Sequence, residues 1–167
     1  MRRVPDPSTP DPSKAPARVK RLAAVLETLA KATGRSFGHD TFGERLRTQK
    51  AIYLLKVLGI PAARRYDFNL YLRGPYSPDL AKDYFMIAPQ MAGVAPEPIP
   101  ERQLRVIEEF VTQGDSFLEA AATIHFIKAH SEETTKEAIL AHARRIKPQL
   151  SHRYEAAYDG LQSVGLL

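Results

Sequence analysis

The side chains that could carry out acid–base or metal chemistry are scattered along this chain of 167 residues. The histidines are isolated in sequence, except for His125 and His130, which lie on different faces of one predicted helix. Without any cysteine, a zinc site would need histidines that meet only in space. The chain also lacks a phosphate-binding glycine loop, a nucleophile elbow and an H-E-x-x-H motif. We therefore predict no catalytic residue, no metal and no cofactor.

Three reactive residue types have simpler structural interpretations. His125 lies in an apolar helix, so we predict a core histidine with one hydrogen-bond partner. The acidic residues of 132–137 flank a predicted helix start, where carboxylates are stabilising. Ser77, followed by Pro78, is typical of a helix cap. An enzyme would need Arg73, Tyr76 and a histidine to meet in one cleft.

Residues suited to recognition lie between positions 71 and 79. Two tyrosines bracket an arginine and a glycine there, an arrangement that suits the recognition of a peptide or a nucleic acid. The alternative is that Tyr76 packs over the turn and has no role in binding. The predicted partner-binding residues are Tyr71, Arg73, Gly74, Tyr76 and Asp79.

The positive charge of the chain is concentrated in residues 45–73. The net charge is +5, yet this segment alone has seven basic side chains against one acidic side chain, Asp67. Such a segment could form a basic surface for phosphates or for an acidic partner, or a solvated face that pairs with the acidic C-terminal half. We expect the cluster to begin on the exposed face of the helix predicted over 42–57, where Arg45, Gln49 and Lys56 lie opposite the apolar residues. The candidates for nucleic-acid binding are Arg45, Arg47, Lys50, Lys56, Arg64 and Arg65.

Periodic apolar residues and caps predict about seven helices. The expected ranges are 17–33, 42–57, 78–88, 100–113, 115 or 116 to about 127, 134 or 135 to 146, and about 154–164. Residues 66–72 alternate as a strand does, and Gly74-Pro75 is expected to end it. A strand needs a partner, which we expect within 60–65 or 93–99. The predicted fold class is mainly α, a helical bundle with a small β-hairpin, similar to a winged helix.

The N-terminal residues 1–16 have a different composition from the rest. They hold five of the thirteen prolines and predict a flexible tail, followed by one globular domain over 17–167. No window approaches the roughly 20 apolar residues of a membrane span. Because cysteine is absent, the sequence suits a reducing compartment, and we expect a cytoplasmic protein. Exposed aromatics and the opposite charges of the two halves are compatible with a homodimer.

Three segments together resemble a known superfamily. They are Q-K-A-I-Y-L-L-K (49–56), Y-D-F-N-L-Y-L-R-G-P-Y-S-P-D-L (66–80) and F-L-E-A-A-A-T-I-H-F (117–126). In this order they are similar to the Panacea or SocA-like antitoxin superfamily, and more closely to its YwgA-like prokaryotic relatives, over roughly 46–167. The resemblance implies a mainly helical domain that acts through protein contacts, for example by neutralising a toxin.

Two functions follow as hypotheses. The first is a non-enzymatic regulatory or protein-interaction module, antitoxin-like or defence-associated, that binds a partner through residues 73–79 and the neighbouring helix. The second is a DNA-binding transcriptional regulator similar to a winged helix, in which 45–73 contacts phosphates and the helix from Pro78 enters the major groove. That helix offers Lys82 against Asp79 and Asp83, which is few basic groups for reading bases.

Overall fold

The computed structural model describes residues 14–71, 74–91 and 94–167, and among these the side chains of all but Tyr71 and Ala88. Within these ranges the chain forms seven α-helices, two short 3-10 helices and a two-stranded antiparallel sheet. The mainly helical fold with a small hairpin is therefore confirmed. The α-helices are α1 (Ala17–Thr33), α2 (Phe42–Val57), α3 (Pro78–Met91), α4 (Glu101–Thr112), α5 (Asp115–His130), α6 (Lys136–Ile146) and α7 (Ser151–Ser163).

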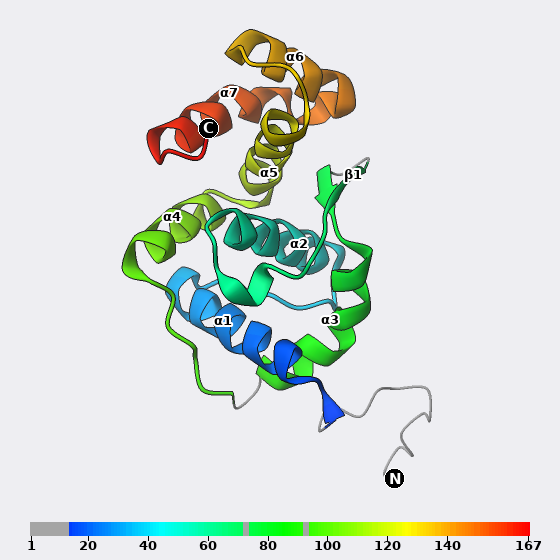
Figure 1. Ribbon diagram of the computed structural model, residues 1–167, viewed down its shortest axis with the longest axis vertical. Coiled ribbons are helices and arrows are strands. Elements are labelled where there is room, and N and C mark those ends of the chain that lie inside the picture. Colours follow the sequence, from blue (N-terminus) through cyan, green and yellow to red (C-terminus); the bar gives the residue numbers. More distant parts are fainter. Residues whose placement is uncertain (1–13, 72–73, 92–93) are drawn as a thin grey trace.

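Helices α2 and α5 join the two ends of the molecule. Figure 1 shows α1 and α3 at one end and α6 and α7 at the other, with α2 and α5 between them. Helix α2 contacts α4, α5 and the sheet, and α5 packs on α6 and α7. One cluster of buried apolar side chains runs through both ends, from Leu22 of α1 to Tyr154 and Leu161 of α7. A single core thus holds the described residues together.

The helix ends follow local signals in the sequence. Helix α1 stops at Gly34, whose φ of 68° is a conformation that glycine adopts without strain. Thr135 caps α6 by accepting a hydrogen bond from the Ala138 amide, as predicted. The predicted cap of α5 is wrong, because Gly114 precedes that helix and Asp115 is its first residue. Helix α3 also runs past the predicted end at Ala88, with Pro89 inside its last turn.

The hairpin differs from the prediction. Strand β1 (Asn69–Tyr71) is shorter than expected and pairs with β2 (Gly74–Tyr76). The expected partner within 60–65 is wrong, since Pro61–Ala63 forms the 3-10 helix η2, and residues 94–99 form no strand. Gly74 and Pro75 do not end the sheet but belong to it. In a sheet of two strands both are edges, where proline is tolerated.

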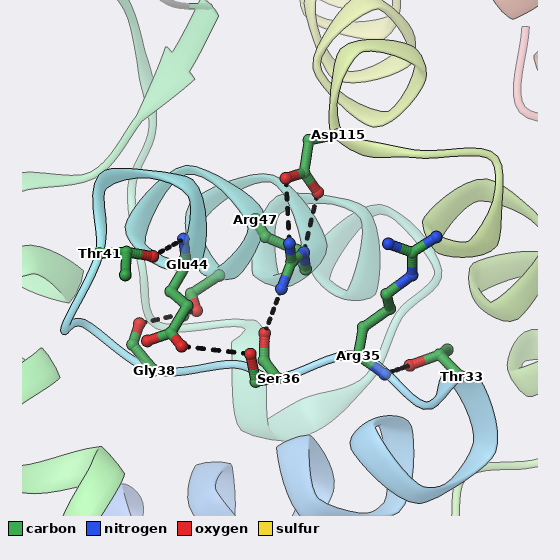
Figure 2. A network of polar contacts seen from close by, with 9 residues as sticks. Thr33, Arg35, Ser36, Gly38, Thr41, Glu44, Arg47 and Asp115 are labelled. Carbon is green, nitrogen blue, oxygen red and sulfur yellow. Dashed lines mark hydrogen bonds and ion pairs between the residues drawn. The ribbon is translucent and has the colours of Figure 1, made fainter.

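The connection between α1 and α2 is fixed by side chains of α2 (Figure 2). Thr41 caps α2 by accepting from the Glu44 amide at 3.1 Å, and the Glu44 carboxylate accepts from Ser36 at 3.2 Å. Arg47 donates to both carboxylate oxygens of Asp115, at 2.8 and 3.0 Å, and to the Ser36 carbonyl. The network ties this loop to the start of α5 and so fixes the position of the N-terminal turn of α2.

The predicted tail lies mostly outside the described residues, which begin at Lys14. Of its last residues, Ala15 is buried in the core and Pro16 immediately precedes α1. None of the helices in the described ranges combines the length and the apolar character that a membrane span requires.

Candidate binding site

Helix α2 turns its Gln49 and Lys50 side chains inward. Gln49 is 2% exposed and Lys50 1% exposed, so two predictions are wrong: that Gln49 lies on the exposed face of this helix, and that Lys50 belongs to a basic surface. Both side chains bind the backbone of the segment that follows the hairpin turn. A fully buried lysine is rare unless a charged or hydrogen-bonding group compensates its ammonium.

Gln49 holds the segment between β2 and α3 through both ends of its amide. Its Nε2 donates to the Ser77 carbonyl at 2.9 Å, and its Oε1 accepts from the Ser77 amide at 2.9 Å. The Ser77 hydroxyl in turn accepts from the Leu80 amide at 3.3 Å, which confirms the predicted cap. One side chain thus satisfies two backbone groups of a buried residue and fixes where α3 begins.

Lys50 binds β2 from the same face of α2. Its Nζ donates to the Pro75 carbonyl at 2.6 Å. Burial lowers the pKa of the Lys50 ammonium from 10.5 to about 7, against the opposite effect of the Glu119 carboxylate. The amine therefore gains or loses its proton near neutral pH.

Gly74 lets β2 approach α5 and α2. Its φ is 81°, and an added Cβ would lie 2.5 Å from the Thr123 hydroxyl oxygen and 3.5 Å from Lys50 Nζ. A larger residue would clash in this position. Thr123 is fully buried, and its hydroxyl has no hydrogen-bond partner within the described part of the chain. Next to this contact, Glu119 of α5 accepts from Lys147 in an ion pair that is buried on both sides.

An aromatic pocket of about 240 Å³ opens between α2, β2 and α3. We use "aromatic pocket" for the cavity lined by Phe42, Arg45, Leu46, Gln49, Lys50, Tyr76 and Tyr84. The Tyr84 hydroxyl donates to the Arg45 carbonyl at 3.2 Å, which joins α3 to α2 across it. Phe42 is 49% exposed at the mouth, and Phe85 of α3, 60% exposed, packs edge-on against His39 in the loop before α2. These two are the large apolar side chains that remain exposed among the described residues.

The predicted partner-binding residues have different positions in this site. Tyr76 lines the aromatic pocket and is partly buried, and Gly74 supports its wall. Asp79 is exposed in the first turn of α3, next to Lys82. Arg73 lies outside the described residues, as does the side chain of Tyr71, whose backbone belongs to β1.

The predicted nucleic-acid residues do not form one surface. Besides the buried Lys50, Arg47 is held by Asp115, and Lys56 donates to the Tyr66 carbonyl at 2.5 Å. Exposed positions are those of Arg45, Arg64 and Arg65, and Arg65 lies over the Tyr66 ring at 5.7 Å. Arg45 also donates to the His39 carbonyl at 2.9 Å, so four of the six residues bind other parts of the chain. A role of the cluster in nucleic-acid binding stays a prediction.

A histidine pocket of about 300 Å³ lies further along α2. We use this name for the cavity lined by Tyr53, Lys56, Val57, Asp67, Phe68, His125, Phe126 and His130. The Tyr53 hydroxyl is 2.7 Å from His125 Nδ1, which confirms the prediction that this histidine has a hydrogen-bond partner. Burial lowers the pKa of His125 from 6.5 to about 4, so its ring is neutral at pH 7. The described residues include no group of three or more metal-binding side chains.

Sequence reasoning missed the residues that organise this site. Glu119 and Thr123 lie in α5, and Lys147 directly follows α6. Nothing in the sequence around these three residues indicates that they lie near the hairpin. Phe42 and Tyr84 were predicted only as helix residues. The available signal was the motif Gln49-Lys50 itself, because two polar residues interrupt the apolar face of α2.

Comparisons of the chain with protein-family models, with curated proteins and with solved structures find no match. The resemblance to the antitoxin superfamily therefore stays a hypothesis that rests on the three segments quoted above.

Proposed function

We propose that this protein is a non-enzymatic regulatory module that binds a protein partner through the aromatic pocket. The observation that carries the proposal is the pocket itself, an apolar cavity with exposed Phe42 at its mouth. Recognition sites typically combine such apolar walls with a few polar groups, and aromatic residues dominate binding energy at protein interfaces.

The rigidity of the pocket wall supports a binding role. Gln49 and Lys50 fix β2 and the start of α3, and the Tyr84 hydroxyl joins α3 to α2. A partner would meet a wall that is ordered in advance, which lowers the entropy lost on binding. The resemblance to antitoxins agrees with this reading, and a toxin or a defence-associated protein is the kind of partner that we propose.

The test measures the affinity of the purified protein for the product of a neighbouring gene. We expect Phe42→Ala and Tyr76→Ala to weaken binding at least tenfold, because both remove aromatic area from the pocket. Arg153→Ala, on the exposed side of α7 at the other end of the molecule, is the matched control. A partner that binds all three variants as tightly as the wild type would contradict the proposal.

DNA binding is the second proposal, and the exposed pair Arg64 and Arg65 supports it. Four of the six basic residues make a hydrogen bond or an ion pair within the fold, and α3 carries Asp79 and Asp83 beside Lys82. If DNA is bound, we expect the affinity to fall steeply with salt and to depend on Arg64 and Arg65. An electrophoretic shift assay at low salt, with Arg64→Ala and Arg65→Ala, tests this. Homodimer formation and a cytoplasmic location also remain predictions.

A further inference from the structure

Lys50, the buried cation among the side chains that line the aromatic pocket, has little negative charge around it. Lys50 and Lys147 are both buried near Glu119, and the Glu119 carboxylate already accepts from Lys147. Lys50 itself donates a hydrogen bond to the Pro75 carbonyl, which is a neutral group. Two cations thus share one carboxylate in a region where an unbalanced charge is costly.

The pocket walls supply no second anion. Among the described residues that line the cavity, Arg45 and Lys50 carry charge and none is acidic. Drug-sized ligands occupy cavities of roughly 300–1,000 Å³, so a cavity of about 240 Å³ suits a single side chain. The lining therefore favours a ligand that is apolar at one end and anionic at the other.

We propose that the aromatic pocket binds the free C-terminus of its protein partner, with an apolar last residue whose carboxylate pairs with Lys50. This inference rests on the proposed function and names the chemistry of the partner. The apolar side chain would lie among Phe42, Leu46 and Tyr84, and Arg45 would attract the carboxylate from the rim. The Lys50 ammonium has three N–H groups and uses one for Pro75, so a carboxylate can be added without breaking that bond.

Binding of such a ligand is coupled to the protonation of Lys50. The charged groups that act on its amine are Glu119 of α5 and Lys147 after α6, while Arg45 of α2, Tyr76 of β2 and Tyr84 of α3 line the same cavity. A carboxylate beside the ammonium raises the pKa of Lys50 from about 7. The complex therefore takes up a proton near and above pH 7, and its affinity falls as the pH rises.

The experiment titrates the full chain with two probes, N-acetylphenylalanine and its uncharged amide, by calorimetry and by NMR at pH 6 and pH 8.5. We expect the acid to bind at least tenfold more tightly than the amide at pH 6, with shifts at Phe42, Tyr76 and Tyr84. We expect that preference to fall about tenfold by pH 8.5, because the neutral amine no longer attracts the carboxylate. Calorimetry in two buffers of different ionisation heat should show proton uptake with the acid and none with the amide.

Lys50→Met should remove the preference for the acid while the amide still binds, and Arg153→Ala should leave both probes unaffected. Equal binding of acid and amide to the wild type would overturn this inference and leave the proposed function intact, as an apolar docking site. If neither probe binds, the inference is overturned as well. If Lys50→Met does not fold, the comparison of acid and amide at two pH values on the wild type decides the matter.

Discussion

The two pockets along α2 differ in how their basic side chains are compensated. In the histidine pocket, His125 has the Tyr53 hydroxyl at 2.7 Å and Lys56 has the Asp67 carboxylate at 3.5 Å. In the aromatic pocket, Lys50 has a neutral carbonyl and shares Glu119 with Lys147. One helix thus presents a balanced set of polar groups on one side and an unbalanced cation on the other. The unbalanced side is where a ligand can contribute a missing charge.

This difference also separates the structural roles of the two pockets. The histidine pocket involves a Tyr53–His125 contact between α2 and α5 and no described strand residue. Lys50, in contrast, is 25 residues from Pro75 and links the hairpin to α2. Changes near Lys50 should therefore affect the fold more strongly than changes near His125.

The largest expected effect is that of Glu119→Gln. It removes the carboxylate that two buried lysines share, and uncompensated buried charges typically cost about 3–5 kcal/mol. We expect a loss of that order in the free energy of unfolding, measured by chemical denaturation at pH 7. Glu133→Gln is the control, because Glu133 pairs with His142 at the surface of the molecule and should matter little.

A loss no larger than that of the control would contradict the view that Glu119 compensates Lys50 and Lys147. The double variant Glu119→Leu with Lys147→Met separates charge from packing. It replaces the ion pair by apolar groups and should recover much of the lost stability.

The next largest effect is expected for Gly74→Ala. Gly74 has a φ of 81°, and its added Cβ would meet Thr123 at 2.5 Å, whereas Gly59 has a φ of 80° and open space around it. A left-handed conformation costs a non-glycine residue roughly 1–2 kcal/mol. Gly59→Ala should show that cost alone, and Gly74→Ala should cost clearly more. Thermal and chemical unfolding of both variants measure the difference. Equal losses would show that the close contact with α5 has no energetic weight.

The helices could be predicted from the sequence because their signals are local. Apolar periodicity and the caps at Gly34 and Thr135 lie within a few residues of the structure that they determine. The strand that pairs with β1 could not be predicted from such local signals. Gly74 and Pro75 are typical of a turn, yet they form β2 because Lys50 and the space beside Thr123 hold them there.

The candidate site was predicted only in part for a related reason. Tyr76 was found because an aromatic residue next to a glycine and an arginine is conspicuous. Lys50 was assigned to a basic surface, since lysine is almost never fully buried. Its burial depends on Glu119, which is far away in sequence and becomes a neighbour only when α2 packs on α5. No local pattern contains that information.

The pH dependence of stability should distinguish Lys50 in the aromatic pocket from His125 in the histidine pocket. The folded protein has a pKa of about 7 at Lys50, below the ordinary value of 10.5, so between these values the unfolded chain binds more protons. Stability should therefore rise with pH from about 7 toward 9.5, by up to about 1.4 kcal/mol per pH unit. Lys50→Met should remove this rise. Denaturant unfolding of both proteins at pH 7, 8 and 9 measures it, and parallel profiles would argue against a lowered pKa at Lys50.

A smaller dependence of the same sign is expected at His125, over a lower range of pH. Its folded pKa is about 4 and its ordinary value 6.5, so the unfolded chain binds more protons between pH 4 and pH 6.5. Stability should rise with pH across that interval and become independent of His125 above it. His125→Phe should flatten this part of the profile and leave the rise above pH 7 unchanged, because Lys50 causes the latter. If His125→Phe also changed the profile above pH 7, the two pockets would be coupled through α2 and α5, and their bases would not titrate independently.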